Sequence, residues 1–379
     1  MNRRHILKLT GGGFIVSAAA LAGFSMTREP SLALAPWHNA GDYADNRLYA
    51  LSYAILAPNP HNRQPWQIEL IGDDKIRIYR DLVRNLPHTD PFERQLTIGM
   101  GCFLEGLNLA LGSRGLTSEI DLFPSANEGF VAEVRVMEAN LSSQTGALAQ
   151  TTEAVAQDKS LFGSILGRRS CKESFLDKAV ASEKLASLGQ YGDVITAPDE
   201  VDVLRKISLD AFRVEYETPR TLKESVDLMR MGKAQINANP DGIDLGGTSM
   251  ELMQVTGIIT PEALMDKTSS AYQQGWDIYE TMLSATPNYI LLKTKGNRRE
   301  NQIAAGRRWM RLNLATTGMG LALHPVSQAL QEYAEMKPHY DAIHEQFAEA
   351  NETIQMFGRV GYGPTVAFTP RWSIEAKLI

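Results

Sequence analysis

Two apolar segments far apart in the chain share a short sequence pattern. Leu107-Asn108-Leu109-Ala110 with Gly115-Leu116 recurs as Leu312-Asn313-Leu314-Ala315 with Gly320-Leu321, and the two copies match at six positions of ten at an offset of 205 residues. At the same offset Gly101 falls on Gly306. Both copies end an apolar helix that runs toward a strand, and such a repeat indicates a duplicated unit. We therefore expect two related halves, residues 40–155 and 156–379.

The composition is that of a globular protein. Of the 379 residues, 44% are hydrophobic and 22% are charged, which excludes disordered, collagen-like and coiled-coil chains. The net charge of -6 and the pI of about 5.7 argue against nucleic acid as a partner, because binding phosphates needs a basic surface. A chain of this length can bury a large core without disulfides. Cys102 and Cys171 can form one bridge at most, and burial as apolar residues is the favoured interpretation.

The N-terminal residues resemble a twin-arginine export signal. Arg3-Arg4 precedes a weakly hydrophobic stretch of 14 residues, Gly11 to Phe24, which is shorter than the about 20 residues that a transmembrane helix needs. We predict that residues 1–35 are a signal read by the twin-arginine export machinery and that the protein is periplasmic. This route carries proteins that fold before export, often around a cofactor. Ala33-Leu34-Ala35 has the form of a cleavage site, but Pro36 disfavours cleavage there.

An uncleaved anchor therefore stays open as an alternative. No other apolar stretch in the sequence reaches transmembrane length, so no stable membrane span is expected unless the signal is retained.

Helical and strand patterns occur in both halves, which indicates the α+β class. We expect helices where apolar residues recur with helical spacing, and strands where they alternate between turn residues. The expected helices are 42–56, 94–113 and 302–317, with a mainly helical region over 160–235; the expected strands are 66–71, 75–79, 119–123, 130–137 and 289–293, with strand-like segments in 355–368. Residues 139–158 are expected to form a connecting helix or linker, and 236–248 to form a loop.

Three short segments carry candidate chemistry. The first, 57–66, is a proline-rich loop between a helix and a strand that could present Asn62 in a fixed geometry. The second, 167–175, places three cations and a hydroxyl within five residues, which suits an anion such as a phosphate. The third, 361–372, combines a glycine turn with a late arginine, Arg371. Taken singly, each has an ordinary alternative: a rigid turn, a solvated basic turn and a surface arginine.

Together the three segments resemble the nitroreductase family of flavin mononucleotide (FMN) enzymes. That family has an arginine run, an Asn-x-Gln-Pro-Trp loop and a late arginine. The run is matched by Arg168, Arg169, Ser170 and Lys172, the loop by Asn62 and Gln64 before Pro65-Trp66, and the late arginine by Arg371. A proline-centred turn that faces the flavin in the family is matched by Pro325, Ser327 and Gln328. Pro58-Asn59-Pro60 departs from the family's usual Pro-Ser start of the loop.

The order of these segments is reversed relative to ordinary family members. Here the loop precedes the arginine run, whereas family members are dimers in which one subunit gives the run and the other the loop. The resemblance therefore implies a nitroreductase-like fold in which two fused halves form a pseudo-dimer, each a sheet flanked by helices, as in the single-chain Acg-type branch. No second run precedes residue 42 and no second loop follows residue 190. We expect one FMN per chain, at the interface of the halves.

The resemblance implies an FMN-dependent oxidoreductase that reduces a small-molecule electron acceptor such as a quinone or a nitro compound. FMN supplies the redox chemistry, so no catalytic acid–base pair is nominated, and the histidines lack metal-ligand spacing. NAD(P)H is not normally available in the periplasm, which leaves the electron donor open. Two alternatives follow: a flavin-storage protein with a lid over residues 236–265, and oxidative consumption of the flavin itself.

Overall fold

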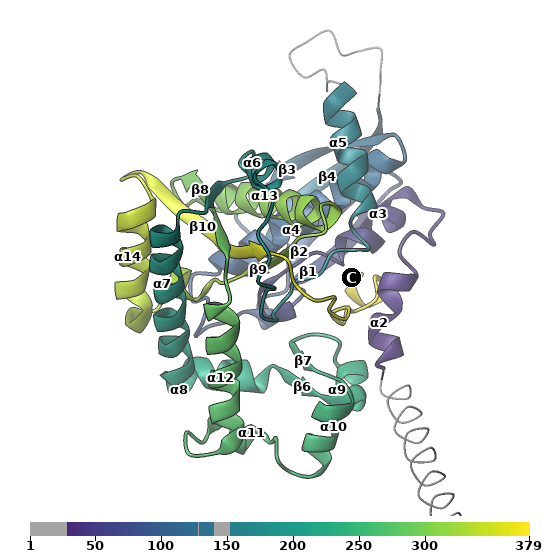
Figure 1. Ribbon diagram of the computed structural model, residues 1–379. Helices are drawn as coiled ribbons and strands as arrows, with labels where there is room; N and C mark the ends of the chain where they lie inside the picture. Colours follow the sequence, from purple (N-terminus) through teal and green to yellow (C-terminus); the bar gives the residue numbers. More distant parts are fainter. Residues whose placement is uncertain (1–28, 128, 140–151) are drawn as a thin grey trace, which may run out of the picture.

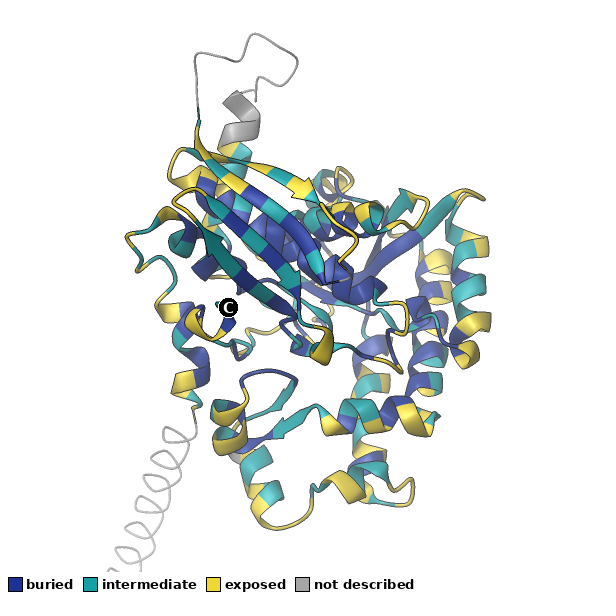
Figure 2. Cartoon of the chain, turned by 180° about the vertical axis from the view of Figure 1, so that it is seen from behind, coloured by how far each residue is buried: buried dark blue, intermediate teal, exposed yellow. Residues whose placement is uncertain are grey.

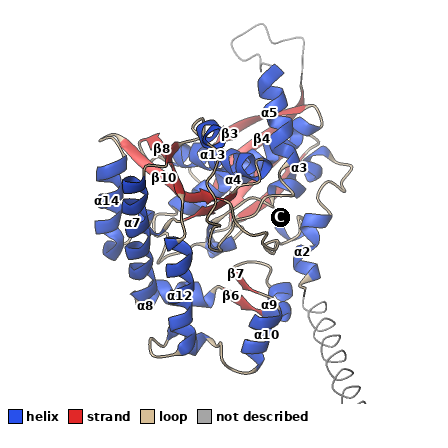
Figure 3. Ribbon diagram, in the orientation of Figure 1, coloured by secondary structure: helices blue, strands red, loops and turns tan. Residues whose placement is uncertain are grey.

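The computed structural model describes residues 29–127, 129–139 and 152–379. Most of the predicted export signal, and most of the predicted linker 139–158, lie outside the described residues. The elements form two antiparallel sheets with two long helices between them and a separate group of short helices beneath (Figure 1). Figure 3 shows that strands are confined to the upper part, apart from one short pair, β6 and β7. The α+β class expected from the sequence is confirmed.

The first sheet comes from residues 66–138. Its strands are β1 (Trp66–Ile71), β2 (Lys75–Arg80), β3 (Leu116–Leu122) and β4 (Phe130–Glu138), in the order β1-β2-β4-β3 and all antiparallel. The helices α2 (Ser31–His38), α3 (Asn46–Ala54) and α4 (Arg94–Ser113) belong to the same region. Asp45 caps α3 by accepting hydrogen bonds from the Arg47 and Leu48 amides, as its N-cap position favours. Short 3-10 turns occur at η1 (Pro60–Asn62) and η2 (Leu82–Arg84).

The second sheet has the same strand order. It contains β5 (Asp193–Ile195), β8 (Asn288–Lys295), β9 (Ala322–Pro325) and β10 (Glu352–Gly361), ordered β5-β8-β10-β9 and again antiparallel. In each sheet one long helix joins the second strand to the third: α4 in the first, and α13 (Arg299–Gly318) in the second. The other helices of this region are α5 (Thr152–Gly163), α6 (Ser182–Leu188), α7 (Pro198–Glu217) and α14 (Lys337–Phe347), with 3-10 turns η3 (Gln328–Leu330) and η4 (Ala334–Met336).

The two long helices cross at a pair of glycines. A Cβ atom added to Gly101 would lie 2.9 Å from the Gly306 Cα atom and overlap the Ile303 carbonyl oxygen. A Cβ atom added to Gly306 would lie 2.8 Å from the Gly101 Cα atom and overlap the Ile98 carbonyl oxygen. The contact is thus reciprocal, as at a twofold axis, and both of its pairs are separated by the 205-residue offset of the sequence repeat.

A layer of short elements lies beneath the sheets. It contains α8 (Pro219–Asp227), the parallel strands β6 (Met229–Met231) and β7 (Ile243–Leu245), α9 (Gly232–Ala238), α10 (Thr248–Val255), α11 (Pro261–Met265) and α12 (Ser270–Ser284). Residues 229–265 of this layer are called the cover below. The sequence expectation of a loop over 236–248 was wrong in part, because Gly232, Gly242 and Gly247 allow tight turns with positive φ between short elements.

The C-terminal residues return from the second sheet to the first. After β10 the chain passes α2, where the Trp37 indole donates to the Thr369 carbonyl at 2.8 Å. It ends beside β1, where the Ile379 amide donates to the Ile68 carbonyl after the short turn η5 (Glu375–Lys377). The expected strand-like structure in 355–368 is provided by β10, which ends at Gly361; beyond it the tail has no strand and crosses between the sheets.

The region 160–235 is less helical than its pattern indicates. Residues 168–181 have no regular secondary structure, and β5 interrupts the helices at Asp193.

Figure 2 shows that buried positions follow the long helices and the inner faces of the strands. Among the described residues, one helix, α4, has the length and hydropathy of a membrane span, but 83% of its most apolar window is buried inside the protein. It is the central core helix of this fold.

Candidate functional site

A cavity of about 450 Å³ lies between the two sheets and the cover. The first half contributes residues of the loop 58–62 and of α4; the second half contributes residues 168–172, α7, β9 and the turn after it. The cover and α12 line the opposite wall, and Thr369 and Arg371 of the C-terminal tail complete it. The cavity volume is in the range of small-molecule and cofactor sites. It lies at the interface of the halves, where the sequence predicts a site.

One end of the cavity carries three cations. Arg168, Lys172 and Arg371 all line it, and none of them forms an ion pair with an acidic side chain of the described residues. Arg371 donates only to oxygens of the backbone and to the Asn62 amide oxygen, the latter at 2.7 Å. Arg168 donates to the Leu56 carbonyl at 3.0 Å, while its Nε and Nη1 are buried without a partner.

These arginines are held at an electrostatic cost. Arg168 is 2% exposed and Arg371 is 3% exposed. Burial lowers the pKa of Arg168 to about 10, and burial together with the nearby Arg168 lowers the pKa of Arg371 well below its usual value. Unpaired charges are rarely kept in protein interiors, because their desolvation is not offset. An anionic group bound at this end would provide the missing partner and the acceptors for the Arg168 Nε and Nη1 donors.

One carboxyl group of the cover also reaches this cavity. Asp244 on β7 lines it, and burial raises the pKa of Asp244, while Lys172 and Arg371 act in the opposite direction.

The loop that carries Asn62 is held in an unusual backbone conformation. His61, Asn62 and Gln64 all have positive φ, at 46°, 50° and 48°, a region that non-glycine residues seldom adopt. Gln64 keeps the loop in place: its amide nitrogen donates to the Pro240 carbonyl at 2.7 Å and its amide oxygen accepts from the Trp372 amide at 2.9 Å. Lys377 also donates to the Gln64 carbonyl at 2.8 Å. Gln64 therefore positions the loop without lining the cavity.

Eight of the ten predicted site residues line this one cavity. They are Asn62, Arg168, Ser170, Lys172, Pro325, Ser327, Gln328 and Arg371. Gln64 supports the loop from behind, and Arg169 points elsewhere: its guanidinium lies 3.4 Å from the centre of the Phe368 ring and donates to the Leu166 and Arg168 carbonyls. The irregular path of this segment thus turns Arg168 into the cavity and Arg169 onto Phe368.

Another part of the cavity wall is formed by β9 and the turn that follows it, close enough for Lys172 to act on His324. The resemblance places a proline-centred turn at Pro325, Ser327 and Gln328, but Pro325 and the preceding His324 belong to a strand paired with Gly358 and Arg359 of β10. The Arg359 Nε donates to the His324 Nδ1 at 3.2 Å. Because a guanidinium only donates, the His324 proton resides on Nε2, and burial and Arg359 keep its pKa well below the usual value. Ser327 and Gln328 then follow at the start of η3.

Sequence reasoning missed one buried carboxyl group. Glu215 of α7 lines the cavity, is 8% exposed, and accepts a hydrogen bond from the Gln331 amide nitrogen at 3.0 Å. Burial raises the pKa of Glu215 to about 7, against the opposing effect of Gln331 and Gln328. The sequence does contain a signal for Glu215, because it lies on the buried face of α7. That face is formed at helical spacing by Val201, Leu204, Ser208 and Ala211, and Glu215 continues it.

The two cysteines are separate and reduced in the structure. Cys102 lines the cavity, where burial raises its pKa to about 12, and its thiol donates to the Gly306 carbonyl at 3.1 Å. Cys171 is buried next to Pro364. Both are therefore buried apolar residues in this fold.

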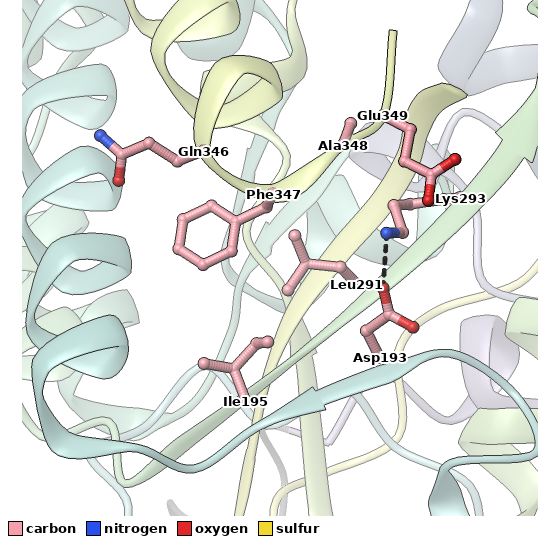
Figure 4. Close-up of a pocket in the computed structure, with 8 residues that line it drawn as sticks. All are labelled: Asp193, Ile195, Leu291, Lys293, Gln346, Phe347, Ala348 and Glu349. Atoms are coloured by element: carbon pink, nitrogen blue, oxygen red, sulfur yellow. Dashed lines mark ion pairs between the residues drawn. The ribbon is translucent and has the colours of Figure 1, made fainter. Parts of the chain in front are cut away.

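A second hollow lies on the outer edge of the second sheet (Figure 4). Its one cation, Lys293, is already paired with Asp193 at 2.7 Å and with Glu352 at 3.1 Å. Because its charges are satisfied, this hollow is a less suitable site for an anion than the cavity between the halves.

The comparisons with known proteins point to one family. No family model matches the chain. A segment of 79 residues, 21% of the chain, is 32% identical to "Putative NAD(P)H nitroreductase acg" from two strains of Mycobacterium tuberculosis. The chain matches about a quarter of the length of these curated relatives, since the segment is 24% of each.

Solved structures of nitroreductases are similar to this chain at low sequence identity and with TM-scores below 0.5. The FMN-dependent nitroreductase NfnB from Mycobacterium smegmatis, in complex with NADPH, is 16% identical, with a TM-score of 0.35, covering 57% of this chain and 96% of that one. A "putative nitroreductase" from Anabaena variabilis is 10% identical, with a TM-score of 0.44 and 82% of each chain covered. A nitroreductase with bound FMN from Bacteroides fragilis is 11% identical, with a TM-score of 0.29, covering 55% of this chain and 91% of that one.

Proposed function

We propose that this chain is an FMN-binding oxidoreductase of the nitroreductase family, with one FMN per chain in the cavity between its halves. The observation that carries the proposal is the group of three cations without acidic partners, Arg168, Lys172 and Arg371. The partial match to a nitroreductase sequence and the motifs shared with that family support it.

The residues present fit such a group. The buried Nε and Nη1 of Arg168 lack partners, and a phosphate offers several strong acceptors that could serve both. Ser170 and Asn62 add polar contacts beside them, while Ile98, Trp309 and Met356 provide an apolar wall for a ring system. A bound flavin would supply hydride and single-electron transfer, and the protein's own share is to bind, orient and shield it.

We propose further that the acceptor is a small, uncharged quinone or nitro compound. The wall opposite α4 is largely apolar and aromatic, with Phe212, Tyr216 and Tyr279 gathered there. The Phe212 and Tyr279 rings are stacked on each other with their centres 4.1 Å apart, so this wall offers aromatic contacts to a ligand ring.

The structure also favours a second candidate function, flavin storage. The cover is fastened to the first half by charged contacts: buried Asp241 pairs with Arg63 and Arg84 of the first half and with Arg230 of the cover. Glu224 of α8, just before the cover, accepts from the His88 and Thr89 amides. A cover fastened in this way would slow the exchange of a bound flavin and limit the access of an acceptor.

We propose export by the twin-arginine route to the periplasm. The triplet Ala33-Leu34-Ala35 lies inside α2, where Ala33 and Leu34 are buried. The Ala33 carbonyl accepts from the Arg371 amide at 2.8 Å, so cleavage after Ala35 would remove a support of the cation end. Any cleavage is therefore expected before α2 begins at Ser31, and the N-terminal sequence of the exported protein would test this.

The test of the proposed function is the flavin content and redox behaviour of the exported protein. We expect about one FMN per chain after heat release. Reduction by a quinol or by NADPH, followed by rapid reoxidation with a quinone, would support an oxidoreductase. A tightly bound flavin that is reduced by dithionite but not reoxidised by quinones would support storage. A protein that neither contains nor takes up FMN would contradict both.

A further inference from the structure

The cavity has a second polar feature, which lies away from the three cations. Glu215 stands on α7 at the end formed by η3 and the apolar wall, whereas Arg168 and Arg371 contact the backbone of residues 55–57. The two ends are thus built from different elements. If a cofactor phosphate is held by the cations, the part of the cavity beside Glu215 stays available to a second ligand.

The Glu215 carboxyl is fixed in direction by its neighbours. The helical stripe of α7 turns it inward, and the Gln331 amide nitrogen holds its Oε2 at 3.0 Å. The Gln328 side chain, which also lines the cavity, approaches the carboxyl as well, and no atom of Glu215 is both enclosed and without a partner. Because Glu215 and Gln328 line the cavity side by side, a ligand there would meet the Glu215 carboxyl.

The charged and titratable groups around Glu215 favour a neutral carboxyl. No lysine, arginine or histidine pairs with Glu215 anywhere in the described ranges 29–127, 129–139 and 152–379. Glu224 of α8 faces it as a like charge, the Tyr333 hydroxyl faces it from the turn after η3, and Gln328 and Gln331 face it from η3. Burial outweighs the two amides, and the pKa of Glu215 rises to about 7.

We propose that Glu215 determines which ligands this end of the cavity accepts: as a carboxylic acid it donates a hydrogen bond to the carbonyl or nitro oxygen of an uncharged ligand, and as a carboxylate it repels anionic ones. This inference rests on the proposed function for the identity of the ligand, since it assigns a specificity residue to the same cavity. The apolar and aromatic side chains beside Glu215 would contact the ring of such a ligand.

The test is ligand binding by the FMN-loaded protein without turnover. Menadione, an uncharged quinone, and a naphthoquinone sulfonate of similar size would be titrated while tryptophan fluorescence is recorded, because Trp309 lines the cavity. For the unaltered protein the dissociation constant of menadione should rise by about tenfold per pH unit above about pH 7. The sulfonate should bind at least about tenfold more weakly than menadione at about pH 8.5.

The variants separate the role of Glu215 from general damage. Glu215→Gln keeps a donor that does not titrate, so menadione binding should lose its pH dependence and the sulfonate should bind more tightly. Glu215→Met has no donor and should bind menadione weakly at every pH. It tests the same role if the Gln variant folds poorly. Glu217→Gln, an exposed residue two positions along α7, is the matched control and should behave as the unaltered protein.

Two outcomes would overturn the inference: an unchanged pH dependence in Glu215→Gln, or equal binding of the two quinones at about pH 8.5 in the unaltered protein. Flavin content is measured separately after heat release. A flavin-free protein that still binds menadione with the expected pH dependence would remove the proposed cofactor and leave the role of Glu215 intact.

Discussion

The helices α4 and α13 occupy equivalent places in the two sheets, yet they line the cavity differently: α4 contributes four residues and α13 contributes Trp309. Both have 20 residues, and the 205-residue offset places the first residue of α4, Arg94, on the first residue of α13, Arg299. On α4, Gly99 and Cys102 line the cavity. The same offset leads to Ala304 and Arg307 on α13.

The corresponding flank of α13 is closed by charge. Arg307 donates to the Glu105 carboxylate at 2.7 Å, and Arg311 pairs with both Glu105 and Asp158. On α4 the small Gly99 instead lets the loop approach, since a Cβ atom there would lie 3.1 Å from the Asn59 Cβ atom. Arg307, which the offset places on Cys102, is thus held by buried Glu105, which is 1% exposed, and does not line the cavity as Cys102 does.

The largest effect is expected from breaking the helix crossing itself. In Gly306→Ala the new Cβ atom overlaps the Ile98 carbonyl, which is backbone and cannot move aside, so the free energy of unfolding should fall by about 3 kcal/mol or more. Gly112→Ala on α4 is the control: nothing lies within 4 Å of its Cβ position, so stability should be unchanged or slightly higher. Chemical denaturation measures both. Equal stabilities would show that the glycine contact is not what joins the halves.

The two flanks should respond in opposite ways to the loss of an arginine. Arg168→Met removes a buried cation without an acidic partner, so we expect the FMN dissociation constant to rise by about 100-fold while the flavin-free protein becomes more stable by about 1 kcal/mol. Arg307→Met should leave FMN binding unchanged and destabilise by about 1 kcal/mol, because Glu105 loses a partner. Flavin titration and denaturation give both quantities; a destabilised Arg168→Met with normal FMN affinity would contradict a binding role.

Glu215, which lines the cavity, should make the free energy of unfolding depend on pH. Its folded-state pKa of about 7 lies above the ordinary value of 4.5, so its contribution to stability is fully present below about pH 4.5 and is lost as the pH rises through about 7. Between about pH 5 and pH 8 this loss should amount to about 2 kcal/mol of unfolding free energy for the flavin-free protein, and Glu215→Gln should remove that part of the pH profile. The difference between the two denaturation profiles is the readout, and parallel profiles would show that Glu215 is not titrating in this range.

The smallest effect of a substitution is expected at the cover, which lines the cavity. Asp241→Asn would leave Arg63, Arg84 and Arg230 without their shared carboxylate, so the cover should detach more often and FMN should be released about tenfold faster. The recovery of flavin fluorescence after dilution measures this rate. Asp227→Asn is the control, because Asp227 forms an exposed ion pair with Lys223 in α8. An unchanged rate in Asp241→Asn would weaken the case for storage beneath a fastened cover.

The long elements could be predicted from the sequence, and the short ones could not. The strand bounds 66–71 and the helix bounds 94–113 were predicted as the structure has them, because turn residues delimit the strand and a continuous apolar pattern defines the helix. The prediction for the cover failed for a different reason. Its elements have three to eight residues, too few to show a helical or strand periodicity in the sequence, and they are held by tertiary contacts with the first half.

The candidate site could be predicted to the level of segments but not of individual side chains. The motifs identified the loop, the run and the late arginine, and the fold gathers all three around one cavity. Which residue of Arg168 and Arg169 faces inward depends on the path of an irregular segment that no periodicity describes. Glu215 was overlooked because no motif includes it, although a carboxyl group on the apolar stripe of α7 is a visible exception.

The central claim is that Arg168 donates to the phosphate of FMN, with Lys172 and Arg371 adding positive charge beside it. The most direct measurement compares the affinities of FMN and of riboflavin, which has the same ring but no phosphate, for the flavin-free protein by calorimetric titration. The account predicts that FMN binds at least about 100-fold more tightly, and that Arg168→Met removes most of this difference. Equal affinities for FMN and riboflavin, or a preference for FMN that survives in Arg168→Met, would contradict it.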